Sequence, residues 1–358
     1  MVGLGSLTNT FLNNALYYCD GNPILMPLFQ VTAVSSEMTY SMLSKINIGS
    51  SPQSRFDKYV LDYKKAYSQI SDSKKIAIVT GANSGIGTIT TKALGLAGFH
   101  VIMACRSKEQ TEDAISKLKL ETDLDCFEFM ELDLASFASI NTFIKNFKKS
   151  YDKLHLLVNN AGVMMCPYAK TKDGLEMQFG TNHVGHFILT NGLVDTLKAS
   201  APARVVVLSS VAHYGGSYDK EIITDEKLYN KVKNYGTSKL ANIMFANELS
   251  RRLSGTGVTV NSLHPGSINT NLSRHIDPSA SSVFTPVFNV MKDTLLLSPL
   301  AGTLTSVMVA LSPELEGVTG KYFAHEGEAN VLSEALDEAK CKDLWNFTEE
   351  LIKKHSTK

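Results

Sequence analysis

The chain is 358 residues long, and 44% of its residues are apolar. That proportion is typical of a soluble protein with a packed core, in one large domain or two modest ones. Lysine plus arginine balances aspartate plus glutamate at 35 each. The neutral balance gives no basic footprint for nucleic acid and no strong attraction to anionic lipid, so we expect no nucleic-acid partner.

The five cysteines form no Cys-x-x-Cys pair and are odd in number, which favours free thiols in a reducing compartment. The N-terminus lacks the basic segment of a secretory signal, because the first lysine is Lys45. Its most apolar stretch, 23–34, is interrupted by Pro27 and Gln30 and is shorter than the roughly 20 residues that span a bilayer. We expect a cytoplasmic protein and leave open peripheral contact with a membrane or lipid droplet.

Residues 1–72 show no sustained period, so we expect a poorly ordered extension or a segment lying in a membrane interface. From Lys74, short apolar runs alternate with longer helical patterns. The expected strands are 76–79, 101–104, 127–132, 154–158, 205–208, 258–263 and 321–323. The expected helices are 86–97, 111–120, 136–149, 174–197, 235–253 and 299–311.

Alternation of strands and helices predicts a parallel sheet covered by helices on both faces. The uninterrupted apolar strand 205–208 fits a strand that is buried on both sides. We therefore expect an α/β fold with a doubly wound parallel sheet, in one domain over residues 73–358 that follows the extension 1–72.

A glycine-rich turn joins the first expected strand to the first expected helix, with the sequence Gly81-Ala82-Asn83-Ser84-Gly85-Ile86-Gly87. Glycines allow a tight turn and let a pyrophosphate approach the backbone, while the helix N-terminus supplies free N–H groups and a partial positive charge. The strand–turn–helix context is the one that a dinucleotide site requires. The spacing Gly-x3-Gly-x-Gly departs from the common Gly-x-Gly-x-x-Gly pattern.

Tyr235 and Lys239 lie four residues apart on an expected helix, so their side chains share one face. A free tyrosine has a pKa of about 10, and a nearby ammonium lowers that pKa by stabilising the phenolate. A tyrosine tuned in this way can protonate a developing alkoxide or deprotonate an alcohol. Taken alone, a tyrosine and a lysine one helical turn apart are usually only an exposed helix pair.

The variant glycine turn and five further motifs, in the right order, resemble the short-chain dehydrogenase/reductase family over about residues 74–323. These motifs are Asp133-Leu134, Asn159-Asn160-Ala161-Gly162, Ser209-Ser210, Tyr235-Gly236-Thr237-Ser238-Lys239 and Pro265-Gly266-Ser267-Ile268-Asn269-Thr270. The resemblance implies a Rossmann-type fold and an enzyme that transfers a hydride between a nicotinamide dinucleotide and a carbonyl or alcohol.

The same resemblance implies a role for each catalytic residue. Tyr235 would be the acid/base, and Lys239 would also bind the nicotinamide ribose. Ser210 would hydrogen-bond the substrate oxygen, with Ser209 as the alternative because adjacent serines leave the register open. Asn182 would be the fourth catalytic residue and would hold a water that links Lys239 to solvent; alternatively, it only satisfies backbone groups.

The cofactor contacts implied by the resemblance are Gly81, Asn83, Ser84, Gly85, Ile86, Gly87, Arg106, Asp133, Leu134, Asn160, Ala161, Gly162, Tyr235, Lys239, Pro265, Gly266, Ile268 and Thr270. Enzymes that prefer NAD place an acid at the end of the second strand to bind the ribose 2′-hydroxyl. Residues 104–108 contain no acid but include Arg106 and Lys108, and a guanidinium matches a phosphate. We expect NADP(H), with NAD(H) as the alternative if Arg106 is only a surface residue.

Segments 160–165, 179–187 and 320–323 resemble the retinol dehydrogenase and WW-domain oxidoreductase branch, and segments 182–196 and 312–318 look closest to its polyprenol dehydrogenase. Both groups imply a small lipophilic substrate, retinoid- or polyprenol-like. The segment 271–297 is rich in Val, Phe, Leu and Met and would line a greasy pocket, touch a membrane or form an ordinary lid. The insert 212–232 is expected to form a loop beside the active site.

His183 and His186 lie three residues apart without a third ligand nearby, so we expect packing residues and no metal site. A homodimer is implied by family analogy alone. The alternative function is a catalytically weak, cofactor-binding regulatory or scaffold protein. The complete set of Asn182, Ser210, Tyr235 and Lys239 favours the enzyme.

Overall fold

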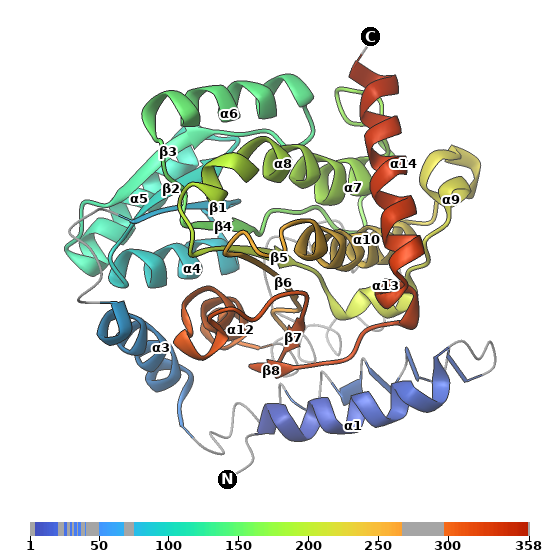
Figure 1. Cartoon of the computed structure of the whole chain (residues 1–358), viewed down its shortest axis with the longest axis horizontal. Coiled ribbons are helices and arrows are strands. Elements are labelled where there is room, and N and C mark those ends of the chain that lie inside the picture. The colour runs from blue at the N-terminus through green and yellow to red at the C-terminus, as the bar shows by residue number, and fades with distance from the viewer. Residues whose placement is uncertain are drawn as a thin grey trace, which may run out of the picture.

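The computed structural model describes residues 4–20, 25–26, 29–30, 32–33, 35–36, 40, 50–67, 75–266 and 297–356. At its centre lies an eight-stranded sheet with the order β3-β2-β1-β4-β5-β6-β7-β8 (Figure 1). The strands are β1 (Lys75–Thr80), β2 (Phe99–Cys105), β3 (Phe127–Glu131), β4 (Leu156–Asn159), β5 (Ala203–Leu208), β6 (Val258–Leu263), β7 (Tyr322–Ala324) and β8 (Gly327–Glu328). Neighbouring strands run parallel from β3 to β7, and β8 returns antiparallel to β7.

Helices cover both faces of the sheet and bury it between two hydrophobic clusters. They are α3 (Pro52–Tyr67), α4 (Gly85–Leu96), α5 (Lys108–Thr122) and α12 (Pro299–Leu311) on one face, and α6 (Phe137–Ser150), α8 (Gly185–Lys198) and α10 (Lys231–Arg252) on the other. All seven residues of β2 are buried, as a strand covered on both faces requires. The expected doubly wound α/β fold is confirmed.

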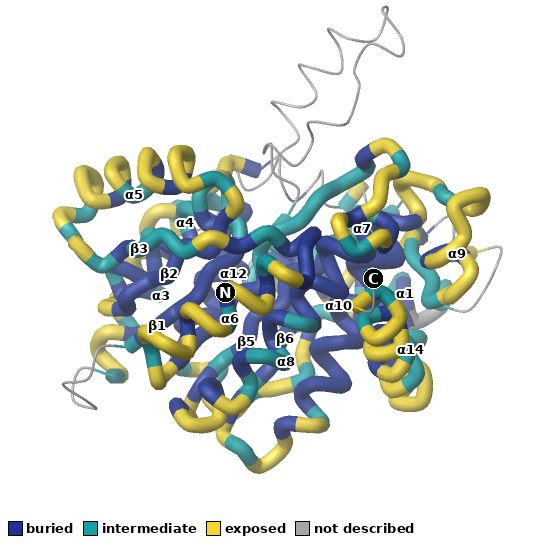
Figure 2. The backbone as a smooth tube through the Cα atoms, turned by 90° about the horizontal axis from the view of Figure 1, so that it is seen from above, coloured by how far each residue is buried: buried dark blue, intermediate teal, exposed yellow. Residues whose placement is uncertain are grey.

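The strand order reverses at β1, which pairs with β2 on one side and with β4 on the other. The connections after these strands therefore diverge to opposite sides, and a crevice forms outside their carboxyl ends. Open α/β sheets bind ligands at such a switch point. Figure 2 shows the buried strands at the centre of the molecule and the exposed outer face of α5 at its edge.

The expected helix 174–197 is divided in the structure. It consists of α7 (Met177–Phe179), a π-helical turn (Gly180–Val184) and α8. Apolar periodicity predicts the helix but not its winding. A π-turn inside a helix frequently accompanies a functional site, and this one contains Asn182.

Two helices lie within residues 1–72, where the sequence shows no sustained period. The first is α1 (Leu4–Cys19), which lies beside the β7–β8 edge (Figure 1). The Asn9 side chain donates to the Ala324 carbonyl at 2.7 Å, and the Asn13 side chain accepts from the Asn330 N–H at 2.7 Å. These partners lie more than 300 positions along the chain, at the other end of the sequence. A local pattern cannot reveal contacts of that kind.

The second helix, α3, is part of the main core. Its residues Phe56, Val60 and Tyr63 are buried in the same cluster as α4 and α12. The Tyr59 hydroxyl donates to the Glu326 carboxylate at 2.9 Å, which ties α3 to the β7–β8 turn. The buried positions 56, 60 and 63 follow a helical period that is confined to this helix. A search for a period sustained over residues 1–72 does not detect it, so the expectation of a poorly ordered extension is wrong for α3.

The C-terminal region adds α13 (Ser333–Leu336) and α14 (Glu338–Ser356), which the sequence analysis did not predict, as it did not predict β8. The helix α14 packs on α10, and its Trp345 ring lies 4.6 Å from the Phe187 ring of α8. In the described part of the chain, no helix has both the length and the apolar character to cross a membrane.

Candidate active site

A cavity of about 540 Å³ opens at the carboxyl ends of the central strands, within the usual range of about 300–1,000 Å³ for ligand sites. Of the predicted site residues, it is lined by Gly81, Asn83, Ser84, Gly85, Ile86, Gly87, Arg106, Asp133, Leu134, Asn160, Ala161, Gly162, Ser210, Tyr235, Lys239, Pro265 and Gly266. Ile268, Thr270 and residues 271–296 of the apolar segment 271–297 lie outside the described residues.

The glycine turn forms the floor of this cavity and leads into α4. Gly81 and Gly85 have φ angles of +63° and +57°, which side chains other than glycine rarely adopt. A side chain on Gly87 would overlap the Gly81 carbonyl oxygen. The N-cap Ser84 makes no capping hydrogen bond with its side chain, so the first-turn N–H groups of α4 keep their capacity to bind an anionic ligand. These donors fit the pyrophosphate of a dinucleotide.

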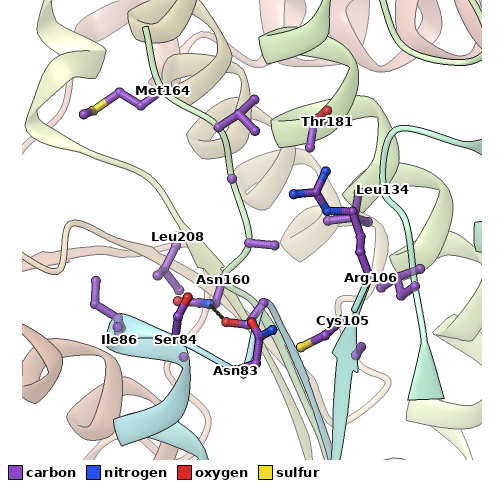
Figure 3. A pocket seen from close by; sticks show the side chains of 18 of the residues that line it. Asn83, Ser84, Ile86, Cys105, Arg106, Leu134, Asn160, Met164, Thr181 and Leu208 are labelled. Carbon is purple, nitrogen blue, oxygen red and sulfur yellow. Dashed lines mark hydrogen bonds between the residues drawn. The ribbon is translucent and has the colours of Figure 1, made fainter. Parts of the chain in front are cut away.

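The turn after β4 is held against the end of β1. The Asn160 amide donates to the Thr80 carbonyl at 2.7 Å, close to the glycine turn (Figure 3). The Thr80 hydroxyl accepts from the N–H groups of Asn160 and Ala161 at 2.8 and 2.9 Å. The two segments that line the cofactor side of the cavity therefore behave as one hydrogen-bonded unit.

Tyr235 and Lys239 project from α10 into the buried end of the cavity. Their exposed fractions are both 4%, and the Lys239 ammonium lies 5.7 Å from the centre of the Tyr235 ring. The ammonium donates to the Leu208 carbonyl at 3.3 Å. The four-residue spacing thus places Tyr235 and Lys239 in one site, as expected from the helix geometry. The two side chains are buried, so they are not an exposed helix pair.

The two serines at the end of β5 have different surroundings. The Ser209 hydroxyl donates to the Lys239 carbonyl at 2.7 Å, so it fastens α10 to β5. Ser210 precedes the 3₁₀ turn Val211–Gly215, and its hydroxyl accepts from the Ala212 N–H at 3.2 Å. It is also close enough to Tyr235 to influence the pKa of that residue. The geometry favours Ser210 as the residue that contacts the substrate. The insert 212–232 continues from this turn and contains the short helix α9 (Lys220–Thr224).

Burial controls the protonation of the Tyr–Lys pair. It raises the pKa of Tyr235 to about 12, opposed by the hydrogen bond with Ser210. It also lowers the pKa of Lys239 to about 8. The direction for Tyr235 is opposite to the expected one, because desolvation of the phenolate outweighs any effect of the ammonium. Without ligand, Tyr235 is a protonated acid at neutral pH.

The buried charge of Lys239 should make the cofactor-free protein less stable at neutral pH. Its pKa of about 8 lies below the ordinary 10.5, so the unfolded chain holds the proton more tightly. The cost is fully present below pH 8 and decreases as the pH rises toward 10.5. Replacing Lys239 with methionine should therefore raise the free energy of unfolding by about 1–3 kcal/mol at pH 7, and by less at pH 10.

Urea unfolding of both proteins at pH 7 and pH 10 measures this effect. Lys153→Met serves as the control, because Lys153 is exposed and its loss should change stability by less than about 0.5 kcal/mol. A Lys239→Met protein that is less stable than the wild type at both pH values would show that the ammonium stabilises the fold. The variant should in any case lose turnover and cofactor affinity.

Asn182 lies behind the cavity wall. Its side-chain amide donates to the Val163 carbonyl at 2.9 Å and to the Ser238 hydroxyl at 3.0 Å, and its oxygen accepts from the Val163 N–H at 2.8 Å. A Cβ atom on Gly162 would lie 3.1 Å from the Asn182 oxygen and 3.6 Å from the Lys239 nitrogen. Asn182 therefore connects the turn after β4 with α10, close to the ammonium.

Charged residues surround the opposite end of the cavity. Arg106 extends from the end of β2 past Leu134 (Figure 3) and is exposed. It forms no ion pair with any residue in the described part of the chain. Lys108, by contrast, lies 3.7 Å from the Glu112 carboxylate on the same helix. Asp133 pairs with Lys172 at 3.0 Å. Arg106 is thus the cation that lines this part of the cavity.

Several lining residues were missed by the sequence analysis: Ala104, Cys105, Ser107, Gln110, Leu132, Ala135, Val163, Met164, Met177, Thr181, Leu208 and His264. Most of them adjoin a predicted motif, and this proximity is the signal that could have found them. Met177 and Thr181 carry no such signal, since the divided helix brings them to the cavity. In the described part of the chain, no group of three or more His, Cys, Asp or Glu residues is arranged to hold a metal ion.

The family model described as short chain dehydrogenase matches residues 75–280. The chain therefore belongs to the short chain dehydrogenase family and is an oxidoreductase of that family. It is similar to retinol dehydrogenase 14 of Mus musculus, with 44% identity over 289 residues that cover 78% of this chain and 86% of that protein. It is also similar to human retinol dehydrogenase 13, with 43% identity covering 78% of this chain and 84% of that protein. The expected family and its retinol-dehydrogenase-like branch are confirmed.

Solved structures show the same architecture. An uncharacterized protein from Mycobacterium paratuberculosis matches with a TM-score of 0.62 and 31% identity, over 79% of this chain and 95% of that chain. Pseudomonas aeruginosa RhlG, in an active-site complex with NADP, matches with a TM-score of 0.54 and 26% identity, over 71% of this chain and 95% of that chain.

Proposed function

We propose that the chain is an NADP(H)-dependent oxidoreductase that acts on a lipophilic alcohol, aldehyde or ketone of retinoid- or polyprenol-like character, with Tyr235 as the acid/base. The observation that carries the proposal is the placement of Ser210, together with the buried Tyr235 and Lys239, in the same cavity as the glycine turn. The dinucleotide, when bound, donates or accepts the hydride. The residues of the chain bind, orient and transfer the proton.

In the reducing direction, the hydroxyl of Tyr235 would donate its proton to the substrate oxygen while the carbonyl carbon gains the hydride. Ser210 would hydrogen-bond the same oxygen, since it lines the same cavity as Tyr235. The Lys239 ammonium would stabilise the resulting phenolate electrostatically. In the oxidising direction, the same phenolate would accept the alcohol proton.

A lipophilic substrate is supported by two observations. The lining of the cavity includes the apolar residues Val163, Met164, Met177 and Leu208, and apolar walls favour apolar ligands. The relatives described above carry the name retinol dehydrogenase.

We also propose that the protein contacts a membrane or lipid droplet peripherally, and that it assembles as a homodimer. Cosedimentation with vesicles tests the first proposal, and light scattering tests the second.

The decisive experiment follows NADPH oxidation by the purified protein with retinaldehyde, a polyprenal and short-chain aldehydes. The proposal expects turnover of the long apolar aldehydes at lower KM than the short ones. Binding of NADPH without turnover of any carbonyl or alcohol would favour the scaffold alternative. No binding of either dinucleotide would refute both.

NADP(H) should bind at least about tenfold tighter than NAD(H), a difference of roughly 1.4 kcal/mol. The reason is that Arg106 can form a charge-assisted, bidentate contact with the 2′-phosphate, whereas no acid ends β2. Arg106→Ala should remove most of the preference, because it should weaken the binding of NADP(H) and leave that of NAD(H) unchanged. Fluorescence titration with both dinucleotides measures it.

Lys108→Ala is the matched control, because the Lys108 ammonium already lies near Glu112. It should change the ratio of the two affinities by less than about threefold, as expected for an exposed surface pair. Equal affinities in the wild type, or an unchanged preference in Arg106→Ala, would remove Arg106 from phosphate recognition.

A further inference from the structure

The buried side chain of His186 bridges two parts of the active site that are distant in sequence. Its exposed fraction is 1%. Its Nδ1 atom lies 2.9 Å from the backbone carbonyl oxygen of Asn182, and its Nε2 atom lies 2.9 Å from the Thr80 hydroxyl. Neither the proton transfer nor the cofactor contacts described above use this ring.

The chemistry of the partners determines the tautomer. A carbonyl oxygen can only accept, so Nδ1 carries the proton and donates it. In the neutral ring, Nε2 must then accept the Thr80 hydroxyl hydrogen. Burial, with a contribution from the Lys239 charge, lowers the pKa of His186 to about 4, so this neutral form persists at physiological pH. The Thr80 oxygen remains free to accept the N–H groups of Asn160 and Ala161.

These bonds complete a clamp on the turn after β4. At one end of the turn, Thr80 binds Asn160 and Ala161. At the other end, the Asn182 amide binds both backbone groups of Val163. His186 is the link between the two ends, because it bonds to the Thr80 hydroxyl and to the Asn182 carbonyl.

We propose that His186 is a positioning residue that holds the turn 160–163 and the Asn182 amide in register with the cofactor cavity and Lys239. The inference rests on the proposed function and deepens it. Loss of the ring would remove one hydrogen bond from the Asn182 carbonyl and would leave the Thr80 hydroxyl hydrogen only its longer 3.4 Å bond to the Val158 carbonyl. Each lost hydrogen bond costs about 0.5–1.5 kcal/mol. The turn that lines the cavity would then lose its defined position.

His183 provides a matched control on the π-helical turn that directly precedes α8, the helix of His186. It is as deeply buried as His186, with an exposed fraction of 1%. Its Nε2 atom lies 3.0 Å from the Thr348 hydroxyl of α14, and its ring packs 4.9 Å from the Phe179 ring. His183 thus supports the C-terminal helix and makes no hydrogen bond to the turn 160–163 among the described contacts.

The test measures NADPH affinity by fluorescence titration, together with kcat, KM and the melting temperature, for the full chain and three variants. His186→Phe keeps an aromatic ring but loses both hydrogen bonds, so the Kd for NADPH should rise at least about tenfold and kcat should fall. His186→Gln offers one donor and one acceptor, and should restore Kd to within about threefold of the wild type. His183→Phe should lower the melting temperature without changing the Kd.

A double-variant cycle tests the route through Thr80. Thr80→Val removes the hydroxyl at nearly constant volume. If His186 acts through that hydroxyl, the double variant with His186→Phe should bind NADPH about as well as the weaker single variant, whereas independent effects would multiply. If His186→Phe does not fold, the comparison of His186→Gln with and without Thr80→Val decides.

Multiplying effects, or a His186→Phe protein that differs from the wild type only in melting temperature, would overturn the positioning role. These outcomes leave the proposed function standing, because they presuppose a wild type that binds and turns over. A wild type that binds no dinucleotide would instead refute the proposed function itself.

Discussion

Replacement of Tyr235 by phenylalanine is expected to lower kcat by about 10²–10⁴-fold, the usual contribution of general acid–base catalysis. The ring is almost fully buried on α10, and phenylalanine preserves its packing while removing only the hydroxyl that would carry the proton. Cofactor affinity should therefore remain close to that of the wild type. Steady-state kinetics and NADPH titration of the same preparation measure both quantities.

Tyr151→Phe controls for the loss of a tyrosine hydroxyl elsewhere. The Tyr151 hydroxyl donates to Glu128 at 2.5 Å, and Tyr151 does not line the cavity. The turnover of the Tyr151→Phe protein should therefore match that of the wild type. Near-normal turnover of Tyr235→Phe would contradict the acid/base assignment. Loss of NADPH binding in that variant would instead place Tyr235 mainly in cofactor binding.

Removal of residues 1–72 is expected to prevent folding, whereas removal of residues 1–50 should leave a protein that folds and binds NADP(H). The longer deletion takes Phe56, Val60 and Tyr63 from the main core. Each buried apolar side chain is worth about 1.5–3 kcal/mol, and three together approach the 5–15 kcal/mol stability typical of a domain. Circular dichroism during heating and NADPH titration distinguish the two proteins.

The shorter deletion spares α3, and no described residue before position 50 lines the cavity. It does remove contacts near Ser210: the Gln30 amide donates to the Tyr214 carbonyl at 2.8 Å, and the Phe29 ring lies 4.9 Å from the Tyr214 ring. We therefore expect a lower melting temperature and a reduced kcat with unchanged cofactor affinity. If the shorter protein is folded but cannot bind NADP(H), residues 1–50 contribute to the cofactor site. If the protein that lacks residues 1–72 folds normally, α3 is not required for folding.

Sequence alone predicts the central sheet well because its strands are buried on both faces. A strand such as β5 must then be continuously apolar, as Val205 to Leu208 are, and such runs are visible without any partner. The motifs also follow these strands. Since parallel strands present their carboxyl ends at one edge, Gly81, Asn160 and Ser210 could be expected to meet, and they line one cavity.

The tertiary structure decided the features that depend on distant contacts. The helix α1 is held by residues near the opposite end of the chain, including Ala324, and no local pattern reveals such contacts. The helix α3 has a short helical period of its own, but its place in the main core depends on partners such as Glu326. The π-helical turn and the bridge from His186 to Thr80 likewise arise only when α8 packs against the ends of β1 and β4.

For Tyr235 and Lys239, the sequence determines their relative position, whereas the folded structure determines their protonation. The spacing of Tyr235 and Lys239 determined that they share a helix face, and the structure places both in one site. Their pKa values depend instead on how much water the surrounding elements exclude, and burial moves the pKa of Tyr235 upward and that of Lys239 downward. Adjacent residues specify strands, turns and helix faces through local geometry. Desolvation is the collective effect of many distant residues, so only the folded chain could determine it.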